Sequence, residues 1–470
     1  MLKASFLVIF LALAITGIAA DKKIVCYYGS WAAYRPGLGQ FEVSNINPNL
    51  CTHLIYTFVG IGTDGSVNVL DSWLDLPSGK DGFGKFTRLR QKSPGIKAMV
   101  AIGGWNEGSV KYSEVVGNPS VRARFVQNVV SFLKQHNFDG FDVDWEYPNQ
   151  RQGKPADREN YIALLAELRS EFNKHGYILS VAVAAAEASA SQSYLIPQLS
   201  QHVHFINLMT YDLNGSWNNF AGLNAPMYPS SRESGAQLKL NVNSAVRYWL
   251  SQGAPADKLI LGVPTYGRSF SLANAGNNGV GAPTVGGGNA GPYTRESGML
   301  GYNEICAFIS QGGWNVVRDS QQHVPYAFKG NQWVGYDDVQ SVREKAEYVK
   351  SLGLGGAMVW SIETDDFRGT CGEAYPLLNT LNSVLKGRTP SSVPTKAPVR
   401  PSTPKPPPPP PSTNVCTREG YIRDPKVCSV FYYCQRVLGK FISHRFDCPD
   451  DLAFDPAIST CNYRSEVSGC

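Results

Sequence analysis

The feature that most constrains the fold of this chain is a regular alternation of short apolar runs with amphipathic segments before residue 388. Eight of the apolar runs have the length and the β-branched or aromatic content of buried strands. Segments between them repeat apolar residues at helical spacing, as Val121, Phe125, Val129 and Phe132 do. Eight strand and helix units in succession predict an α/β fold, a (β/α)8 TIM barrel. The predicted strands are residues 24–28, 53–61, 97–103, 140–147, 178–185, 203–211, 259–265 and 356–362.

One connection in this scheme is too long for an ordinary barrel loop. Residues 266–338, after the seventh predicted strand, form a polar, Gly-rich and aromatic stretch, whereas such connections usually have about 2–6 residues. We expect this stretch to fold as a small α+β insertion. Because it follows a strand, it should lie at the carboxyl end of the barrel, where barrel enzymes hold their active sites.

The first 20 residues have the layout of a secretory signal peptide. Lys3 precedes an apolar run over residues 6–15, and the small residues Gly17, Ala19 and Ala20 follow. A membrane anchor is the alternative, but the run is shorter than the roughly 20 residues that a spanning helix needs. We therefore expect residues 1–20 to be removed and the mature protein to be secreted and extracellular, without a membrane partner.

The composition changes sharply after residue 387. Residues 388–414 are mostly Pro, Ser and Thr, which predicts an extended linker between a catalytic barrel of residues 21–387 and a small domain of residues 415–470. The net charge of the chain is only +5, and charged residues make up 17% of it. Since no long basic run is present, we expect no nucleic-acid partner, and we expect a monomer.

The chemistry is indicated by the run Asp-Gly-Phe-Asp-Val-Asp-Trp-Glu-Tyr at residues 139–147. Side chains on a strand alternate between two faces, so Asp142, Asp144 and Glu146 share one face. Neighbouring carboxylates repel one another, and inside a barrel they would have to share protons. Glu146, nearest the carboxyl end, is the natural proton donor. A solvated surface strand is the alternative, but the opposite face is too apolar for it, and parallel barrel strands are buried on both sides.

This run and four other motifs resemble glycoside hydrolase family 18, over about residues 22–387. The other motifs are Ala-Ile-Gly-Gly-Trp at 101–105, Met-Thr-Tyr-Asp at 209–212, Tyr-Gly-Arg at 266–268 and Gly-Gly-Ala-Met-Val-Trp at 355–360. They are similar to the animal-type chitinases of that family. One departure is mild: many members begin the Gly-Gly motif with Ser, whereas this chain has Ala101 at that supporting position.

The resemblance implies an endo-acting chitinase that cleaves β-1,4 links between N-acetylglucosamine units with retention. It implies substrate-assisted catalysis, in which the acetamido group of the substrate attacks its own anomeric carbon and gives an oxazolinium. Glu146 would be the general acid and then the base, Asp144 would orient the acetamido N–H, and Asp142 would exchange a proton with Asp144. Tyr211 would bind the acetamido carbonyl oxygen. No metal and no organic cofactor is implied.

The resemblance also implies substrate-contacting side chains near the ends of the predicted strands. Aromatic rings suit the flat faces of pyranose sugars, although a single Trp is more often ordinary core material. Arg268 could instead be a structural ion-pair partner. Asn214 begins an Asn-Gly-Ser sequon beside this region, where a glycan would obstruct substrate, so we expect poor occupancy. The expected substrate-binding residues are Tyr27, Trp31, Trp105, Met209, Asp212, Trp217, Tyr266, Arg268 and Trp360.

Ten cysteines fit an oxidising compartment, and six of them crowd into the last 55 residues. Spacing alone leaves 15 pairings of those six open. A zinc site is the alternative, but the tail has no Cys-x-x-Cys. The spacing, with Tyr-Tyr-Cys at 432–434 and Phe-Asp-Pro at 454–456, resembles the peritrophin-A type of chitin-binding domain. That resemblance implies the pairs Cys416–Cys434, Cys428–Cys470 and Cys448–Cys461, and the barrel analogy implies Cys26–Cys51 and Cys306–Cys371.

Three other functions remain open. A lectin-like relative would bind chitin without cleaving it, but such relatives typically lose the acid Glu, whereas Glu146, Asp144 and Tyr211 are all present. A matrix protein built around the C-terminal domain would leave the acidic run unexplained. An endo-β-N-acetylglucosaminidase acting on glycoproteins would share the fold, but the aromatic residues and the C-terminal domain favour a polymer. We therefore expect chitin and chitooligosaccharides as partners.

Overall fold

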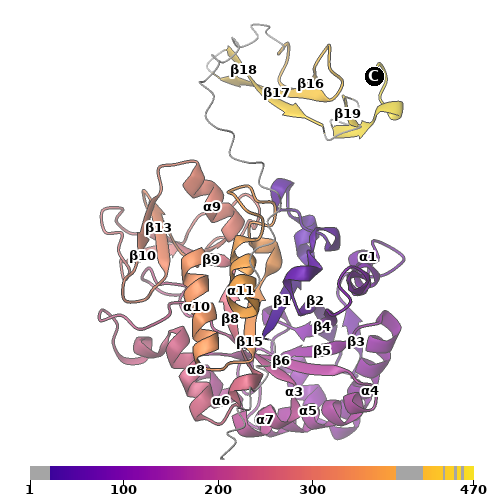
Figure 1. Cartoon of the computed structure of the whole chain (residues 1–470), viewed down its shortest axis with the longest axis vertical. Coiled ribbons are helices and arrows are strands. Elements are labelled where there is room, and N and C mark those ends of the chain that lie inside the picture. The colour runs from indigo at the N-terminus through magenta and orange to yellow at the C-terminus, as the bar shows by residue number, and fades with distance from the viewer. Residues whose placement is uncertain (1–21, 388–415, 438–439, 449–451, 457–459) are drawn as a thin grey trace, which may run out of the picture. The chain divides into compact units, whose positions relative to one another are not determined.

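The structure is a computed structural model that describes residues 22–387, 416–437, 440–448, 452–456 and 460–470. The predicted signal peptide and the whole of the predicted linker, residues 388–414, lie outside these residues. The chain divides into two units, Met1–Ser392 and Val393–Cys470, each of which has its own fold (Figure 1). Within the part that the structure describes, no helix combines the length and the hydropathy of a membrane span.

The first unit contains the predicted parallel barrel. Its strands follow one another in the order β1, β15, β8, β7, β6, β5, β4 and β2, and β2 pairs with β1 to close the ring. A short antiparallel strand that the sequence did not predict, β3 (Val67–Val69), extends β2 outside the ring. The barrel strands are β1 (Lys23–Gly29), β2 (His53–Ile61), β4 (Lys97–Gly103), β5 (Gly140–Asp144), β6 (Ile178–Ala184), β7 (Phe205–Met209), β8 (Leu259–Pro264) and β15 (Gly356–Trp360).

The predicted strands at 140–147 and 203–211 are too long at their carboxyl ends. β5 makes its last ladder contacts through Val143 to β6 and through Asp144 to β4, and none of the described strands pairs with the residues after Asp144. β7 ends at Met209 in the same way. Glu146 and Tyr211 therefore lie just beyond the strands, at the rim of the barrel. The predicted strands at 178–185, 259–265 and 356–362 also extend one or two residues too far.

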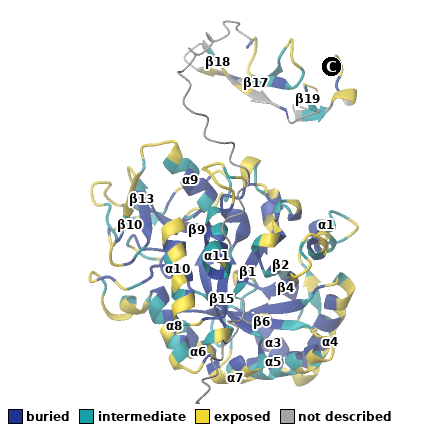
Figure 2. Ribbon diagram, in the orientation of Figure 1, coloured by how far each residue is buried: buried dark blue, intermediate teal, exposed yellow. Residues whose placement is uncertain are grey.

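Alternating side chains divide the core into two layers. On β1, Val25 and Tyr27 belong to the cluster inside the barrel, whereas Ile24, Cys26 and Tyr28 belong to the larger cluster between strands and helices. Figure 2 shows the strands in the buried colour and the exposed residues on the outer faces of the helices. The main covering helices are α3 (Val110–Gly117), α4 (Pro119–His136), α5 (Asp157–Asn173), α7 (Ile196–His202), α8 (Val242–Ser251), α10 (Val339–Ser351) and α11 (Pro376–Lys386).

An α+β insertion follows β8, as the sequence predicts. Its antiparallel strands run in the order β10, β9, β14, β13, β12, and β11 pairs with β9. The Cys306–Cys371 disulfide joins its helix to the segment after β15. The elements are β9 (Tyr266–Leu272), β10 (Thr284–Gly287), β11 (Met299–Gly301), α9 (Tyr302–Ser310), β12 (Asn315–Arg318), β13 (Pro325–Lys329) and β14 (Gln332–Gly335).

The second unit is a small disulfide-rich module. Three of its strands form an antiparallel sheet in the order β16, β17, β18, and β19 pairs with β20. Its disulfides are Cys416–Cys434, Cys428–Cys470 and Cys448–Cys461, and Cys26–Cys51 lies in the barrel; these are the pairs that the resemblances imply. The strands are β16 (Gly420–Arg423), β17 (Val430–Val437), β18 (Lys440–Asp447), β19 (Leu452–Asp455) and β20 (Thr460–Tyr463).

Candidate active site

The acidic run lies at the carboxyl end of β5. Phe141, Val143 and Trp145 pack in the outer core, so the intervening Asp142 and Asp144 face the barrel interior, as the alternation predicts. The neighbouring strand β4 comes very close here. Gly103 has a φ of +109°, and a Cβ on it would lie 2.2 Å from the Asp144 carbonyl oxygen, so the Gly-Gly motif permits this approach.

Asp142 is fully buried and accepts hydrogen bonds from three other strands. The Tyr27 hydroxyl on β1 donates to it at 2.7 Å, Asn207 Nδ2 on β7 donates at 3.3 Å, and Ser180 Oγ on β6 also donates. Asn207 Nδ2 additionally donates to the Tyr27 hydroxyl at 2.9 Å. Burial raises the pKa of Asp142 to about 6, although the three donors favour its ionised form and oppose the rise.

Asp144 is buried, and Glu146 lies half-buried two residues further along. Burial raises the pKa of Asp144 well above its usual range, and the charges of Glu146 and Asp142 add to the rise. Burial also raises the pKa of Glu146 to about 7, although a hydrogen bond with Tyr147 opposes the rise. Among the described residues, Asp144 Oδ1 has no hydrogen-bond partner. The row therefore holds protons at a pH where ordinary carboxyl groups are ionised.

Contacts on the outer side hold the backbone around Glu146. Trp145 Nε1 donates to Ser109 Oγ at 3.0 Å, and Ser109 Oγ donates to the Tyr147 carbonyl at 2.9 Å. Arg151 Nη1 donates to the Glu146 carbonyl at 3.2 Å. These bonds fix the position of the Glu146 main chain although the strand has already ended.

Tyr211 and Asp212 follow the end of β7. The Tyr211 ring is buried, and its hydroxyl lies 3.7 Å from Met358 Sδ, which is a weak acceptor. Asp212 has a φ of +54°, and its Oδ1 accepts hydrogen bonds from the Tyr266 hydroxyl at 2.6 Å and from Arg268 Nε at 2.7 Å. Arg268 therefore makes the ion pair that the sequence left as its alternative role, and it does so beside the acidic row.

Three tryptophans from separate barrel loops are widely exposed. Trp31 is 43% exposed, Trp105 is 59% exposed and Trp217 is 60% exposed. They follow β1, β4 and β7 respectively, so all three belong to the carboxyl end of the barrel. Arg151 Cζ lies 3.7 Å from the centroid of the Trp105 ring and holds one face of that indole.

Trp360, the last residue of β15, lies among other rings. Its centroid is 5.4 Å from that of Tyr27, 5.8 Å from that of Phe58 and 6.3 Å from that of Trp31. Tyr27 was expected to contact substrate, but it is 1% exposed and its hydroxyl binds Asp142 inside the barrel. Met209 is half-buried at the last position of β7.

Several residues that contact the site are not predicted from the sequence. Ser180 and Asn207 bind Asp142, Phe58 stacks near Trp360, and Arg151 caps Trp105. Asn224 is fully buried; its Oδ1 accepts the Asp212 N–H at 2.8 Å, and its Nδ2 donates to the Tyr266 carbonyl at 3.0 Å. The only available signal was the inward position of Ser180 and Asn207 on predicted strands.

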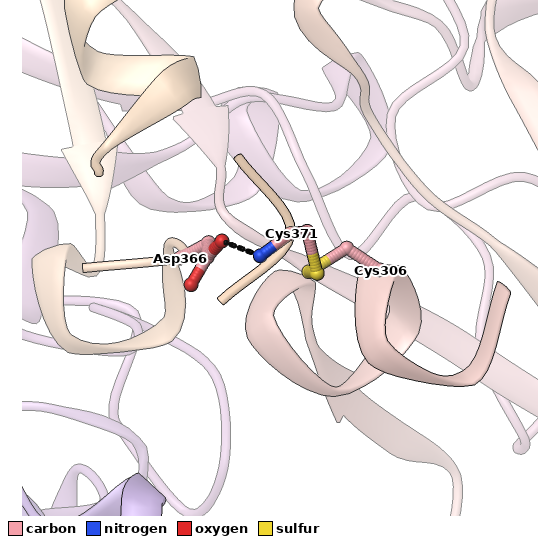
Figure 3. A group of neighbouring side chains, drawn as sticks. All are labelled: Cys306, Asp366 and Cys371. Atoms are coloured by element: carbon pink, nitrogen blue, oxygen red, sulfur yellow. Dashed lines mark hydrogen bonds between the residues drawn. A yellow bond between two sulfur atoms is a disulfide. The ribbon is translucent and has the colours of Figure 1, made fainter. Parts of the chain in front are cut away.

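One cluster outside the acidic row has the residue types of a metal site. The potential ligand atoms of Cys306, Cys371 and Asp366 lie within 4.8 Å of one another (Figure 3). The two sulfurs are joined in a disulfide, so they are not thiolate ligands. Asp366 Oδ2 accepts the Cys371 N–H at 2.8 Å, which ties the carboxylate to this loop. The cluster is therefore a structural cross-link between α9 and the loop after β15.

Comparison with known proteins agrees with this geometry. Residues 23–365 match the model of glycosyl hydrolases family 18, and residues 416–470 match that of the chitin-binding peritrophin-A domain. An endochitinase of Manduca sexta is 43% identical over 414 residues, which cover 84% of this chain and 74% of that protein. A crystal structure of Ostrinia furnacalis Group IV chitinase with allosamidin is 48% identical, with a TM-score of 0.76 over 78% of this chain and 99% of that one.

A further solved structure shares the fold with a different description. Human YKL-39, described as a pseudo-chitinase with retained chitooligosaccharide binding, is 39% identical, with a TM-score of 0.72 over 78% of this chain and all of that one. Fold similarity alone therefore does not separate cleavage from binding. The family model covers well over half of the chain, and the chain belongs to family 18 of the glycosyl hydrolases and carries a peritrophin-A chitin-binding domain.

Proposed function

We propose that this chain is an endo-acting chitinase that hydrolyses β-1,4-linked N-acetylglucosamine polymers with retention, by substrate-assisted catalysis. The observation that carries the proposal is the row of Asp142, Asp144 and Glu146 at the carboxyl end of β5, with each pKa raised by burial. A row of this kind keeps a proton available near neutral pH, which a glycosidase needs for its leaving group.

Glu146 is the proposed proton donor. Its pKa of about 7 means that it carries a proton over the mildly acidic to neutral range. It is half-buried, whereas Asp142 and Asp144 are buried, so of the three it is the carboxyl group most accessible to a glycosidic oxygen. After the leaving group departs, the same carboxylate takes a proton from the incoming water.

The acetamido group of the substrate is the proposed nucleophile. Asp144 Oδ1 is buried without a partner among the described residues, so it suits an acetamido N–H. Among the described residues, the one hydrogen-bond acceptor of the Tyr211 hydroxyl is the weak Met358 sulfur, so this hydroxyl suits the acetamido carbonyl oxygen. These two contacts hold the carbonyl oxygen against the anomeric carbon, and such an intramolecular attack has a high effective molarity.

The charge of the acidic row then supports the intermediate. As the oxazolinium forms, the C–O bond to the leaving sugar breaks, Glu146 transfers its proton to that oxygen, and positive charge develops on the acetamido nitrogen. Asp144 and Asp142 share one negative charge that stabilises it, and the donors on Asp142 help to retain that charge inside the barrel. Water then attacks the anomeric carbon from the face that the leaving sugar occupied and opens the oxazolinium ring, which gives retention.

A polymer is the substrate class that the surroundings support. Trp31, Trp105 and Trp217 offer wide ring surfaces after three different strands, as an extended sugar chain requires. The C-terminal module would hold the enzyme on solid chitin. Five disulfides fit an extracellular location.

The test is hydrolysis of a chitooligosaccharide series by wild type and by Glu146→Gln. We expect the variant to lose about three orders of magnitude or more in kcat while it still binds the oligosaccharides, since Gln keeps the shape but has no transferable proton. Glu171→Gln, at the far end of α5, is the matched control and should retain full activity. Unchanged turnover in Glu146→Gln would contradict the proposal and favour another catalytic group.

A further inference from the structure

Arg151 joins the two loops that carry the acid and one of the exposed tryptophans. It lies in the turn after β5, and its side chain reaches the loop after β4. Its Nη1 donates to the Trp105 carbonyl at 2.6 Å and to the Glu146 carbonyl at 3.2 Å. Its Cζ lies 3.7 Å from the centroid of the Trp105 ring. One guanidinium group therefore contacts the main chain of both loops and one face of the indole.

The turn that carries Arg151 is held by other residues. Arg151 has a φ of +52°, a left-handed conformation that is uncommon for residues with a side chain. Gln150 Nε2 donates to Ser189 Oγ at 2.7 Å, and the Lys154 N–H donates to Asp157 Oδ2 at 2.7 Å. The Arg151 side chain is exposed, so replacing it leaves these bonds in place.

The Trp105 ring is supported differently from the neighbouring Trp31. Trp31 packs with other rings, those of Phe58 at 6.1 Å and Trp360 at 6.3 Å. Trp105 is 59% exposed, and the flat guanidinium group of Arg151 lies on one of its faces, which is a favourable cation–π contact. This contact restrains the indole and leaves the opposite face for a sugar. Without it, the indole must be ordered when the sugar binds, and that ordering weakens binding.

Arg151 also acts on the acid through its charge. Burial raises the pKa of Glu146 to about 7, and the Arg151 guanidinium opposes this rise. The other titratable groups that act on Glu146 come from α3, from β5 and the residue after Glu146, and from the segments before α7 and after β7. They are Tyr112, Asp144, Tyr147, Tyr194, Tyr211 and Asp212. These groups are phenols and carboxyl groups, so Arg151 supplies the positive charge that stabilises the Glu146 carboxylate once its proton has left.

We propose that Arg151 is a positioning residue of this site. It clamps the loop after β4 to the loop after β5, so that a sugar unit on the open face of Trp105 is held in register with the Glu146 carboxyl group. This inference rests on the proposed function. It adds that the binding of the sugar chain and the charge of the acid depend on the same guanidinium group.

The clamp is tested by calorimetry with chitohexaose, on the full chain in a Glu146→Gln background so that the ligand is not digested. Arg151→Gln should raise the Kd about fivefold, the size of one exposed cation–π contact. In a Trp105→Ala background the same substitution should change the Kd by less than about twofold, because the ring through which Arg151 acts is absent. Lys154→Gln removes an exposed cation from the same turn and is the control, which should leave the Kd unchanged. Equal Kd values for the parent and Arg151→Gln, or an equal loss in the Trp105→Ala background, would overturn the clamp.

The charge is tested with Glu146 intact, from the pH profile of kcat/KM for chitotetraose. Arg151→Gln should move the alkaline limb up by about 0.5 unit, because loss of the guanidinium raises the pKa of Glu146. Arg151→Lys keeps the charge and should leave this limb in place, but it should still weaken binding, since an ammonium group does not cover the ring. An unmoved limb in Arg151→Gln, or an equal shift in Arg151→Lys, would overturn the role of the charge. A parent enzyme that does not cleave chitotetraose would refute the proposed function, whereas the Kd values would still decide the clamp.

Discussion

The hydroxyl group of Tyr27 offers a sharp test of how the barrel interior sets the charge of the acidic row. It donates a hydrogen bond to Asp142 Oδ2 at 2.7 Å, and within the described part of the chain its other hydrogen bond is the one that it accepts from Asn207 Nδ2. Tyr27→Phe removes the donor and keeps the ring. A hydrogen bond to a charged group is worth about 1.5–3 kcal/mol, and one pKa unit corresponds to about 1.4 kcal/mol. The pKa of Asp142, now about 6, should therefore rise by about 1–2 units.

The consequence for activity follows from the charge that Asp142 and Asp144 share. Below the pKa of the pair this charge is lost, so the acid limb of the pH profile of kcat/KM should move up by about 1–2 units. The alkaline limb, set by Glu146 at about pH 7, should stay in place, so the two limbs converge and the maximum falls. The assay is initial-rate hydrolysis of chitotetraose across the pH range. Tyr28→Phe is the control, since its ring packs in the outer core.

Two outcomes would refute this reasoning. An acid limb in Tyr27→Phe that coincides with that of wild type would show that Asp142 does not share the catalytic charge. An equal shift in Tyr28→Phe would show that the effect comes from general loosening of the barrel.

Three further predictions follow from the same contacts. Folding raises the pKa of Glu146 from 4.5 to about 7, so the free energy of unfolding of the wild type falls as the pH rises through this range. The free energy of unfolding of Glu146→Gln should therefore exceed that of the wild type at pH 8, by up to about 3 kcal/mol, and match it below pH 4. Asn224→Asp still accepts the Asp212 N–H but places a second acceptor against the Tyr266 carbonyl. The kcat/KM of the variant relative to wild type should therefore fall by about tenfold or more at pH 7 and recover in acid, where the new carboxyl group is protonated and donates. A ratio of variant to wild-type kcat/KM that does not change with pH would contradict this. Asn214 is 4% exposed and donates its Nδ2 to a backbone carbonyl, so intact-mass analysis of the folded, active protein should show no glycan there.

The barrel could be predicted because its strands leave a local pattern. Buried parallel strands are short apolar runs, and the acidic residues at every second position of one run predict their common face. The sequence shows less clearly where strand pairing ends. The run at 140–147 has the pattern of one strand, but the pairing of β5 ends at Val143 with β6 and at Asp144 with Gly103, the last residue of β4.

The partners of the acidic row could not be predicted, because they come from distant strands. Ser180 and Asn207 meet Asp142 only after the barrel closes, and their local signal, an inward position on a predicted strand, does not indicate which residue they contact. The sequence predicts a substrate contact for Tyr27 because it is aromatic and near a strand end; its inward direction on β1, which brings its hydroxyl to Asp142, is a feature that this pattern does not convey. Asn224 lies in a long loop, and because a loop has no regular periodicity, its burial could not be predicted from the sequence.

The central claim is that the acetamido group of the sugar does the work of a nucleophile beside Glu146 and Asp144. Partially deacetylated chitooligosaccharides test it directly, with mass-spectrometric sequencing of the products. The account predicts that every newly formed reducing end is an N-acetylglucosamine unit, because only that unit carries the attacking carbonyl. Products that end in glucosamine, formed at a comparable rate, would contradict it.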